Sequence, residues 1–236
     1  MSRRGAGALT LVLLLVACSG GGNDPSPATT TTSTLVTSTR APTTTAPVEE
    51  VVFDWAAPTT LELPGGWTVA PCGGDAPLAC VAEAGAQAGV VEQLGFPLDS
   101  LPDLEEALAG GTSPDVALEL FAIDERETLE ADRRTGCDPD FEVRLIGPEP
   151  ATVAGQPGVR YGLEGVDGTG AVVERISKHA LLTENALFLV VASALEPDGC
   201  LSPEGDFRVA TLERFEPQLA RLAAGSRFPP PAEPGP

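Results

Sequence analysis

The chain is poor in basic and imidazole side chains. Its 236 residues hold 14 lysines and arginines against 34 aspartates and glutamates, and the single histidine is His179. Lysine also occurs once, as Lys178. Phosphate binding needs a basic footprint, so we expect no nucleic-acid partner and no adhesion through anionic lipid headgroups. We interpret the acidity as a solvated surface that keeps the protein soluble; the alternatives are an acidic face for a cationic partner or for Ca²⁺.

The usual signatures of catalysis and metal binding are also missing. His179 is the only candidate imidazole base, no Gly-x-Ser-x-Gly motif accompanies it, and its neighbours Ser177 and Lys178 fall in an expected strand. No Cys-x-x-Cys motif offers zinc ligands, and residues 138–142 lack the acid-and-glycine order of a calcium loop. The acidic residues 124–132 could pair carboxylates for glycoside hydrolysis, but the solvated face of a helix is the simpler interpretation. We therefore expect no catalytic residue, no metal, no cofactor and no enzymatic activity.

Only one strongly apolar run stands near the start of the chain, from Ala8 to Val16, and Arg3 and Arg4 precede it. A positive start, a short apolar run and small residues are the layout of a secretory signal. A membrane-spanning helix needs about 20 apolar residues, and polar residues follow at 19–24. We expect residues 1–17 to be a signal peptide that leaves no transmembrane helix behind.

The residues around the expected cleavage site are Leu15-Val16-Ala17-Cys18, which resemble the lipobox of bacterial lipoproteins. The resemblance implies that the thiolate of Cys18 takes a lipid as a thioether and becomes the first residue after cleavage. Acyl chains such as palmitate would then anchor an extracytoplasmic protein in the cell membrane. The alternative is an ordinary signal that is cleaved nearby, with Cys18 incidental.

Composition divides the rest of the chain into three parts. Residues 18–50 are rich in Thr, Ser and Pro, and ten of the seventeen residues at 29–45 are Thr. Such a segment buries too little apolar surface to offset the entropy of ordering it, so we expect an extended tether. Residues 51–226 are long enough for one domain with its own core. Residues 227–236 are Pro-rich, and we expect a disordered tail.

Four cysteines remain after Cys18, an even number in a chain with an export signal. Disulfides are the default in that setting, and four cysteines allow three pairings. We favour Cys72–Cys80, because the residues between them are turn-rich. The second pair would then be Cys137–Cys200, both in sequences typical of surface loops.

The first half of the domain predicts three strand regions and a helix. Residues 61–69 read as two short strands around Gly65-Gly66, and residues 78–83 and 90–96 are further strand candidates. Thr112-Ser113-Pro114-Asp115 is typical of a helix start, and we expect a helix from Pro114 to about Arg134. The apolar stripe expected to face the core consists of Val116, Leu120 and Ile123, with Ala117 and Phe121.

The second half predicts an antiparallel meander of strands over 141–146, 158–166, 171–182 and 186–195. Residues 186–192 are apolar at every position, so that strand needs cover on both sides. The predicted helix at 207–224, with a kink at Pro217, could supply part of it through Leu212, Phe215, Leu219 and Leu222. The expected fold class is α+β, an antiparallel β-sheet covered by helices on both faces in an α/β/α sandwich.

This order of elements resembles the PsbP-like fold, and in particular the LpqN-type lipoproteins of mycobacteria and related actinobacteria. The matching pieces are "LELPGGWTV", the mid-domain helix, "AGQPGVRYGLEG", "ERISKHALLTENALFLVVASA" and "FRVATLERF". The resemblance implies a monomeric, non-catalytic binding or scaffolding module for another envelope protein. The alternative is a lipid-anchored carrier of a small molecule or lipid, with Phe96, Phe121 and Phe188 lining a pocket between sheet and helix.

Overall fold

The computed structural model describes residues 61–72, 78–196 and 207–228. Cys18, Cys200, the predicted signal peptide and tether (1–50) and most of the predicted tail (229–236) lie outside the described residues.

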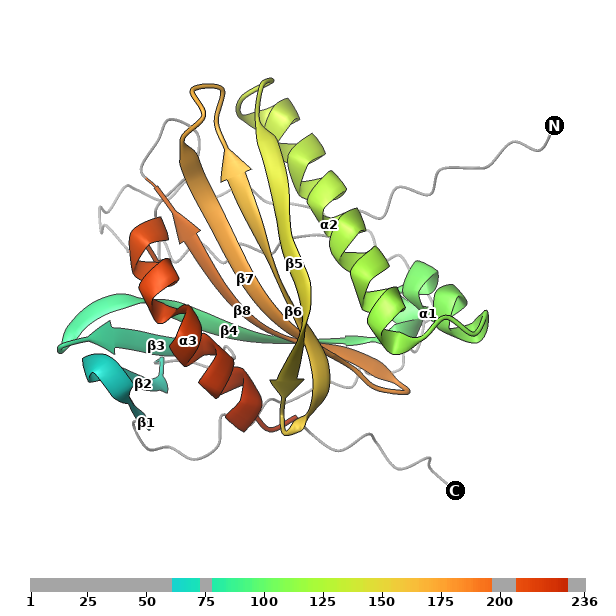
Figure 1. The fold of residues 1–236 in the computed structure, drawn as a ribbon, viewed down its shortest axis with the longest axis horizontal. Coiled ribbons are helices and arrows are strands. Elements are labelled where there is room, and N and C mark those ends of the chain that lie inside the picture. Colours follow the sequence, from blue (N-terminus) through green and yellow to red (C-terminus); the bar gives the residue numbers. More distant parts are fainter. Residues whose placement is uncertain (1–60, 73–77, 197–206, 229–236) are drawn as a thin grey trace, which may run out of the picture. The chain divides into compact units, whose positions relative to one another are not determined.

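The described residues form one sheet of eight antiparallel strands (Figure 1). In chain order the strands are β1 (Leu61–Leu63), β2 (Trp67–Pro71), β3 (Leu78–Glu83), β4 (Ala86–Pro97), β5 (Glu142–Val153), β6 (Gln156–Val166), β7 (Val172–Leu182) and β8 (Ala186–Leu195). Across the sheet they follow the order β1-β2-β3-β4-β8-β7-β6-β5. The predicted meander of the last four strands is therefore confirmed.

The first hairpin forms where the sequence predicts it. Leu63 pairs with Trp67 across a short 3₁₀ turn, η1 (Pro64–Gly66), in which Gly65 and Gly66 both have φ near +80°. Only glycine adopts such angles without strain. The predicted disulfide Cys72–Cys80 ties β2 to β3. Cys137 is disulfide-bonded as well, and its predicted partner Cys200 falls outside the described residues.

Strand β4 joins the two halves of the sheet and is longer than predicted. Its first part pairs with β3, and from Val91 to Pro97 it pairs with β8. Gly89 lies in the part that the sequence did not predict. A Cβ atom there would stand 2.4 Å from the ring of Phe207, so this glycine marks a close approach of a side chain to the strand.

Three α-helices accompany the sheet: α1 (Pro102–Ala109), α2 (Pro114–Gly136) and α3 (Val209–Gly225). Figure 1 shows α3 in front of the sheet and α2 running beside β5. Helix α2 begins where predicted, although the Ser113 side chain makes no capping hydrogen bond. Helix α3 continues through Pro217, and α1 was not predicted.

Alternate residues of β8 belong to two different hydrophobic clusters. Val190, Ala192 and Ala194 pack in one cluster with the predicted α3 residues Leu212, Phe215, Leu219 and Leu222. Leu187, Leu189 and Val191 pack in another cluster with Leu104 of α1 and with Ala117, Leu118 and Ala122 of α2. The side chains of successive strand residues point to opposite faces, which explains why this strand is apolar at nearly every position.

The predicted core face of α2 is only partly right. Ala117 is fully buried and Phe121 packs against the core, as predicted. Val116 is 47% exposed and Leu120 is 52% exposed, so this part of the expected stripe faces outward. The buried residues of α2 are Ala117, Leu118, Ala122, Glu125 and Leu129. A carboxylate, Glu125, lies in the middle of this buried stripe, where the sequence prediction expected only apolar side chains.

The C-terminal half of α2 also covers the edge strand of the sheet. Glu130 accepts a hydrogen bond from the backbone N–H of Val143 at 2.9 Å, and the Arg134 side chain donates one to the carbonyl of Phe141 at 2.7 Å. Further along β5, Pro148 and Pro150 have no N–H to offer. Side chains of α2 therefore occupy part of the outer edge of β5.

Candidate functional site

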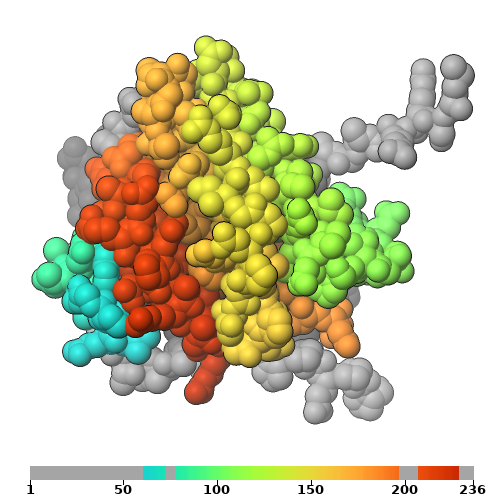
Figure 2. Space-filling view, in the orientation of Figure 1, coloured from blue at the N-terminus to red at the C-terminus, as the bar shows by residue number. Residues whose placement is uncertain are grey.

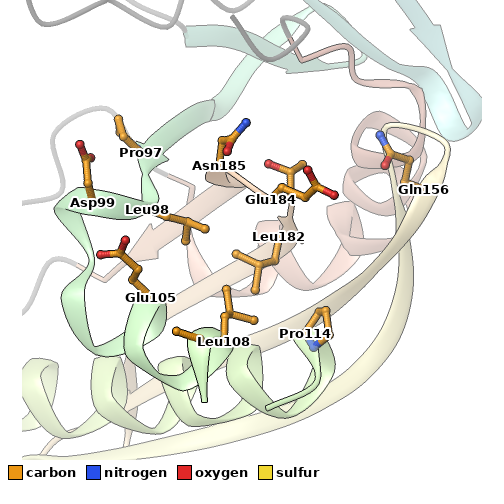
Figure 3. Close-up of a pocket in the computed structure, with 12 residues that line it drawn as sticks. Pro97, Leu98, Asp99, Glu105, Leu108, Pro114, Gln156, Leu182, Glu184 and Asn185 are labelled. Atoms are coloured by element: carbon orange, nitrogen blue, oxygen red, sulfur yellow. The ribbon is translucent and has the colours of Figure 1, made fainter. Parts of the chain in front are cut away.

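A pocket of about 900 Å³ lies at the end of the sheet where β4 stops. It is formed by the end of β4, the 3₁₀ turn η2 (Leu98–Ser100), helix α1, the start of α2, the β7–β8 turn and the start of β6 (Figure 3). Its lining residues are Pro97, Leu98, Asp99, Glu105, Leu108, Ala109, Pro114, Gln156, Leu182, Thr183, Glu184 and Asn185.

Backbone geometry brings these segments together. The N–H of Leu98 donates to the carbonyl of Asn185 at 2.9 Å, which holds η2 against the β7–β8 turn. Pro102 then starts α1, because a proline in the first turn has no N–H to lose. The chain thus changes direction at the end of the sheet, and α1 forms one wall of the pocket.

The pocket has an apolar floor and an acidic rim. Leu98, Leu108 and Leu182 point toward one another in its centre (Figure 3). Asp99 and Glu105 lie on one side and Glu184 on another. None of the twelve lining residues is basic. Such a pocket can hold an apolar stem by burial and attract a positive group attached to it.

The hydroxyl in the pocket lining belongs to Thr183, and its hydrogen bonds are made within the β7–β8 turn. The Thr183 hydroxyl donates to the carbonyl of Ala186 at 3.0 Å and accepts from the N–H of Ala186 at 3.1 Å. The lining contains no histidine, cysteine or lysine. Among the twelve lining residues, no nucleophile stands beside a general base.

The three phenylalanines predicted to line a carrier pocket are not in this one. Phe96 and Phe121 pack around the cluster beneath α1 and α2. Phe188 lies in a separate cluster with Val153 and Leu181, and its ring stacks on Phe228 with centroids 4.4 Å apart. Phe228 belongs to the start of the predicted tail, so that part of the tail has a packing partner.

A buried charged network connects α2 to the sheet, and the sequence prediction missed it. The Lys178 ammonium lies 2.6 Å from one carboxylate oxygen of Glu125, and the Tyr161 hydroxyl donates to the other. Burial, and then the negative charge of Glu125, raises the pKa of Tyr161 well above its ordinary value, so the phenol keeps its proton. Glu125 was expected on a solvated helix face; it is instead buried and paired.

A sequence signal for Glu125 did exist. Leu118, Ala122, Glu125 and Leu129 follow one another at spacings of 4, 3 and 4, the pattern of a buried helix stripe. An acid at such a position needs a cation, and the chain offers one lysine, Lys178, in a strand. Because Lys178 is largely buried and paired with Glu125, we assign it a structural role.

His179 lies on the face of β7 opposite Lys178. It is buried at 5% exposure, and within the described part of the chain neither ring nitrogen has a hydrogen-bond partner. Burial, aided by the charge of Arg160 and opposed by that of Glu216, lowers the pKa of His179 to about 4. The imidazole is therefore neutral at ordinary pH, and it is not part of the pocket.

The acidic residues near the α2–β5 connection hold loops together. The two carboxylate oxygens of Asp138 accept hydrogen bonds at 2.9 Å from the N–H groups of Asp140 and Gly168. Over residues 61–72, 78–196 and 207–228, no group of three His, Cys, Asp or Glu side chains is arranged to hold a metal ion. Over the same ranges, no helix has the length and apolar character needed to cross a membrane.

Comparisons with known proteins find a similarity to a solved structure and none to a known sequence family. No protein-family model matches it, and no curated protein sequence matches it either. Among solved structures it is similar to the solution structure of cyanobacterial PsbP (CyanoP) from Synechocystis sp. PCC 6803. The two are 11% identical, with a TM-score of 0.39 over 71% of this chain and 84% of that one. The similarity is to a protein of the PsbP-like fold that the order of elements predicted, and it concerns the fold alone.

Proposed function

We propose that this chain is a lipid-anchored protein of the bacterial cell envelope whose domain binds another envelope protein without catalysis. The observation that carries the proposal is the pocket with a leucine floor and three acids on its rim. A partner's lysine or arginine side chain has matching chemistry, because it combines an apolar stem with a positive end.

The frame around the pocket suits a binding module. We infer that α3 and the α1–α2 pair cover opposite faces of the sheet, because alternate residues of β8 pack against each. Such a sandwich holds the pocket walls in place before a partner arrives, which lowers the entropic cost of binding.

The proposed location rests on the N-terminal residues. We propose that Cys18 carries the lipid, that residues 18–50 form the tether, and that the protein is an LpqN-type lipoprotein. Mass spectrometry of the processed N-terminus should find Cys18 as the first residue with acyl chains attached. An unmodified thiol at Cys18 would contradict the anchor and leave the pocket unaffected.

The partner is tested by site-specific photo-cross-linking in the native cells. A photoreactive amino acid replaces Asn185 at the pocket rim of the full chain, and we expect a discrete cross-linked protein. Reversing charges with Glu105→Lys and Glu184→Lys should weaken the cross-link by about tenfold or more, because like charges would then face a cationic side chain.

The matched control reverses two exposed acids away from the pocket, Glu62→Lys on β1 and Glu142→Lys on β5. This control should cross-link like the wild type. Equal loss in the control and the pocket variant would show that overall charge matters and the pocket does not.

The volume of the pocket favours one second candidate, a carrier of a small cationic amphiphile, since about 900 Å³ lies within the range of ligand pockets. Native mass spectrometry of the protein released gently from its membrane separates the two functions. A bound molecule of constant mass, lost in the Glu105→Lys and Glu184→Lys variant, would support the carrier over the protein partner.

A further inference from the structure

The outward side of α2 carries an apolar patch that no described element covers. Val116, Leu120 and Ile123 follow at spacings of 4 and 3 and so share one stripe of the helix; we call these three residues the outer ridge. Val116 and Leu120 are about half exposed, and Ile123 is partly exposed. In Figure 2, α1 and the first half of α2 (green) form a margin of the domain in this view.

Exposed acids surround the outer ridge. Glu119 and Asp124 lie on either side of the stripe, and Glu127 extends it by one turn. Glu127 pairs with Arg126 at 2.8 Å, whereas Glu119 and Asp124 have no ion pair among the side chains of the described ranges. Burial, followed by the negative charges of Asp103, Glu127 and Glu125, raises the pKa of Asp124. The negative charge around the ridge is therefore only partly balanced within the domain.

We propose that the outer ridge docks a basic amphipathic helix of a partner protein. Side chains at i, i+4 and i+7 on one helix interlock with the apolar stripe of a second helix. Lysines and arginines flanking that second stripe would face Glu119 and Asp124, and opposite charges across an interface favour the correct encounter.

Charge also disfavours two other occupants of the outer ridge, a second copy of this chain and an anionic bilayer. A second copy of this chain would bring its own Glu119 and Asp124 against the same acids, and like charges across an interface disfavour association. An anionic bilayer is repelled in the same way. The inference rests on the proposed function only in that the domain binds protein. The surface is distinct from the pocket, although Pro114, at the start of α2, lines the pocket.

The probe is a synthetic 18-residue helix with a leucine stripe flanked by lysines, titrated into the mature full chain at 0.15 M salt. The comparison peptide has glutamate at every lysine position. We expect the lysine peptide to bind at least tenfold more tightly than the glutamate peptide. The Leu120→Ser variant should weaken the lysine peptide about tenfold, because it removes the most exposed apolar side chain of the ridge.

The control is Leu61→Ser, which removes a similarly exposed apolar side chain from β1; it should bind the lysine peptide like the wild type. Both serine variants should keep the wild-type melting temperature, since neither position is buried. Equal binding by the Leu120→Ser and Leu61→Ser proteins would overturn the proposal.

Three other outcomes would also overturn the ridge proposal. Loss of binding only in the Glu105→Lys and Glu184→Lys variant would place the peptide in the pocket and leave the proposed function intact. A concentration-dependent dimer that Leu120→Ser dissociates would make the ridge an interface between copies. Binding to zwitterionic vesicles that Leu120→Ser abolishes would make it a lipid contact.

Discussion

Lowering the pH should destabilise the domain through one side chain, His179. Burial lowers the pKa of its imidazole from 6.5 to about 4, whereas in the unfolded chain the imidazole titrates near its ordinary pKa of about 6.5. Between these two pKa values the unfolded state binds more protons than the folded state. The contribution of His179 to the free energy of unfolding should therefore be complete above about pH 6.5, fall as the pH drops from 6.5 to about 4, and change little below that.

The magnitude follows from the difference between the two pKa values. At about 1.4 kcal/mol per pH unit, a shift from 6.5 to about 4 corresponds to a loss of about 3 kcal/mol once His179 is protonated in both states. The charged groups that act on the imidazole are Arg160 on the neighbouring strand β6 and Glu216 on α3. Glu216 is held by Arg175 and Ser177, so it has competing partners when the imidazole becomes charged.

The assay compares urea unfolding of the wild type and the His179→Leu variant between pH 7.5 and 4. Carboxylates away from position 179 contribute equally to both proteins, so the difference between the two curves reports the imidazole and its interactions. The wild type should lose about 3 kcal/mol relative to the variant over this range. Because His179 is the only histidine, its NMR signals also report its pKa directly. A pH-independent difference between the two proteins, or an imidazole that titrates near pH 6.5 in the folded state, would refute the reasoning.

Two further predictions concern packing. Lys178→Met leaves the Glu125 carboxylate buried without its cation, and we expect the free energy of unfolding to fall by about 3–5 kcal/mol. Adding Glu125→Leu should recover much of that loss in a double-mutant cycle, and strictly additive losses would contradict a buried pair. Gly89→Ala places a methyl group 2.4 Å from the ring of Phe207, which should cost about 1–3 kcal/mol and lower the melting temperature. Gly136→Ala meets nothing within 4 Å and should melt at the wild-type temperature or slightly above it, because alanine favours a helix more than glycine does; equal losses at the two glycines would argue against the close contact.

Local patterns were sufficient to predict much of the fold. Gly65 and Gly66 marked the first hairpin because a tight turn needs positive φ at both positions. The continuous apolar run of β8 indicated a strand that is packed on both sides, and its alternate residues belong to two hydrophobic clusters. Phe215 and its apolar neighbours at helical spacing marked the buried face of α3. Each of these signals lies within one short segment.

The errors came from interactions between distant segments. The face of α2 was assigned from a stripe that includes Val116 and Leu120, but the buried face also holds the carboxylate of Glu125, which pairs with a lysine more than 50 residues away. Helix α1 is only eight residues long and buries a single side chain, Leu104. Its sequence therefore lacks the repeated apolar spacing by which a helix is predicted. The pocket was not predictable, because segments far apart in the chain create it by meeting at the end of β4.

The hydrogen bond from Val143 to Glu130 limits how the sheet can grow. A free outer strand invites another chain to add itself and so begin aggregation. A strand that added to β5 would have to displace the Glu130 carboxylate from the backbone N–H of Val143. It would then meet Pro148 and Pro150, which have no N–H to donate. At the opposite end of the sheet, β1 spans only three residues and so offers a short template for an added strand.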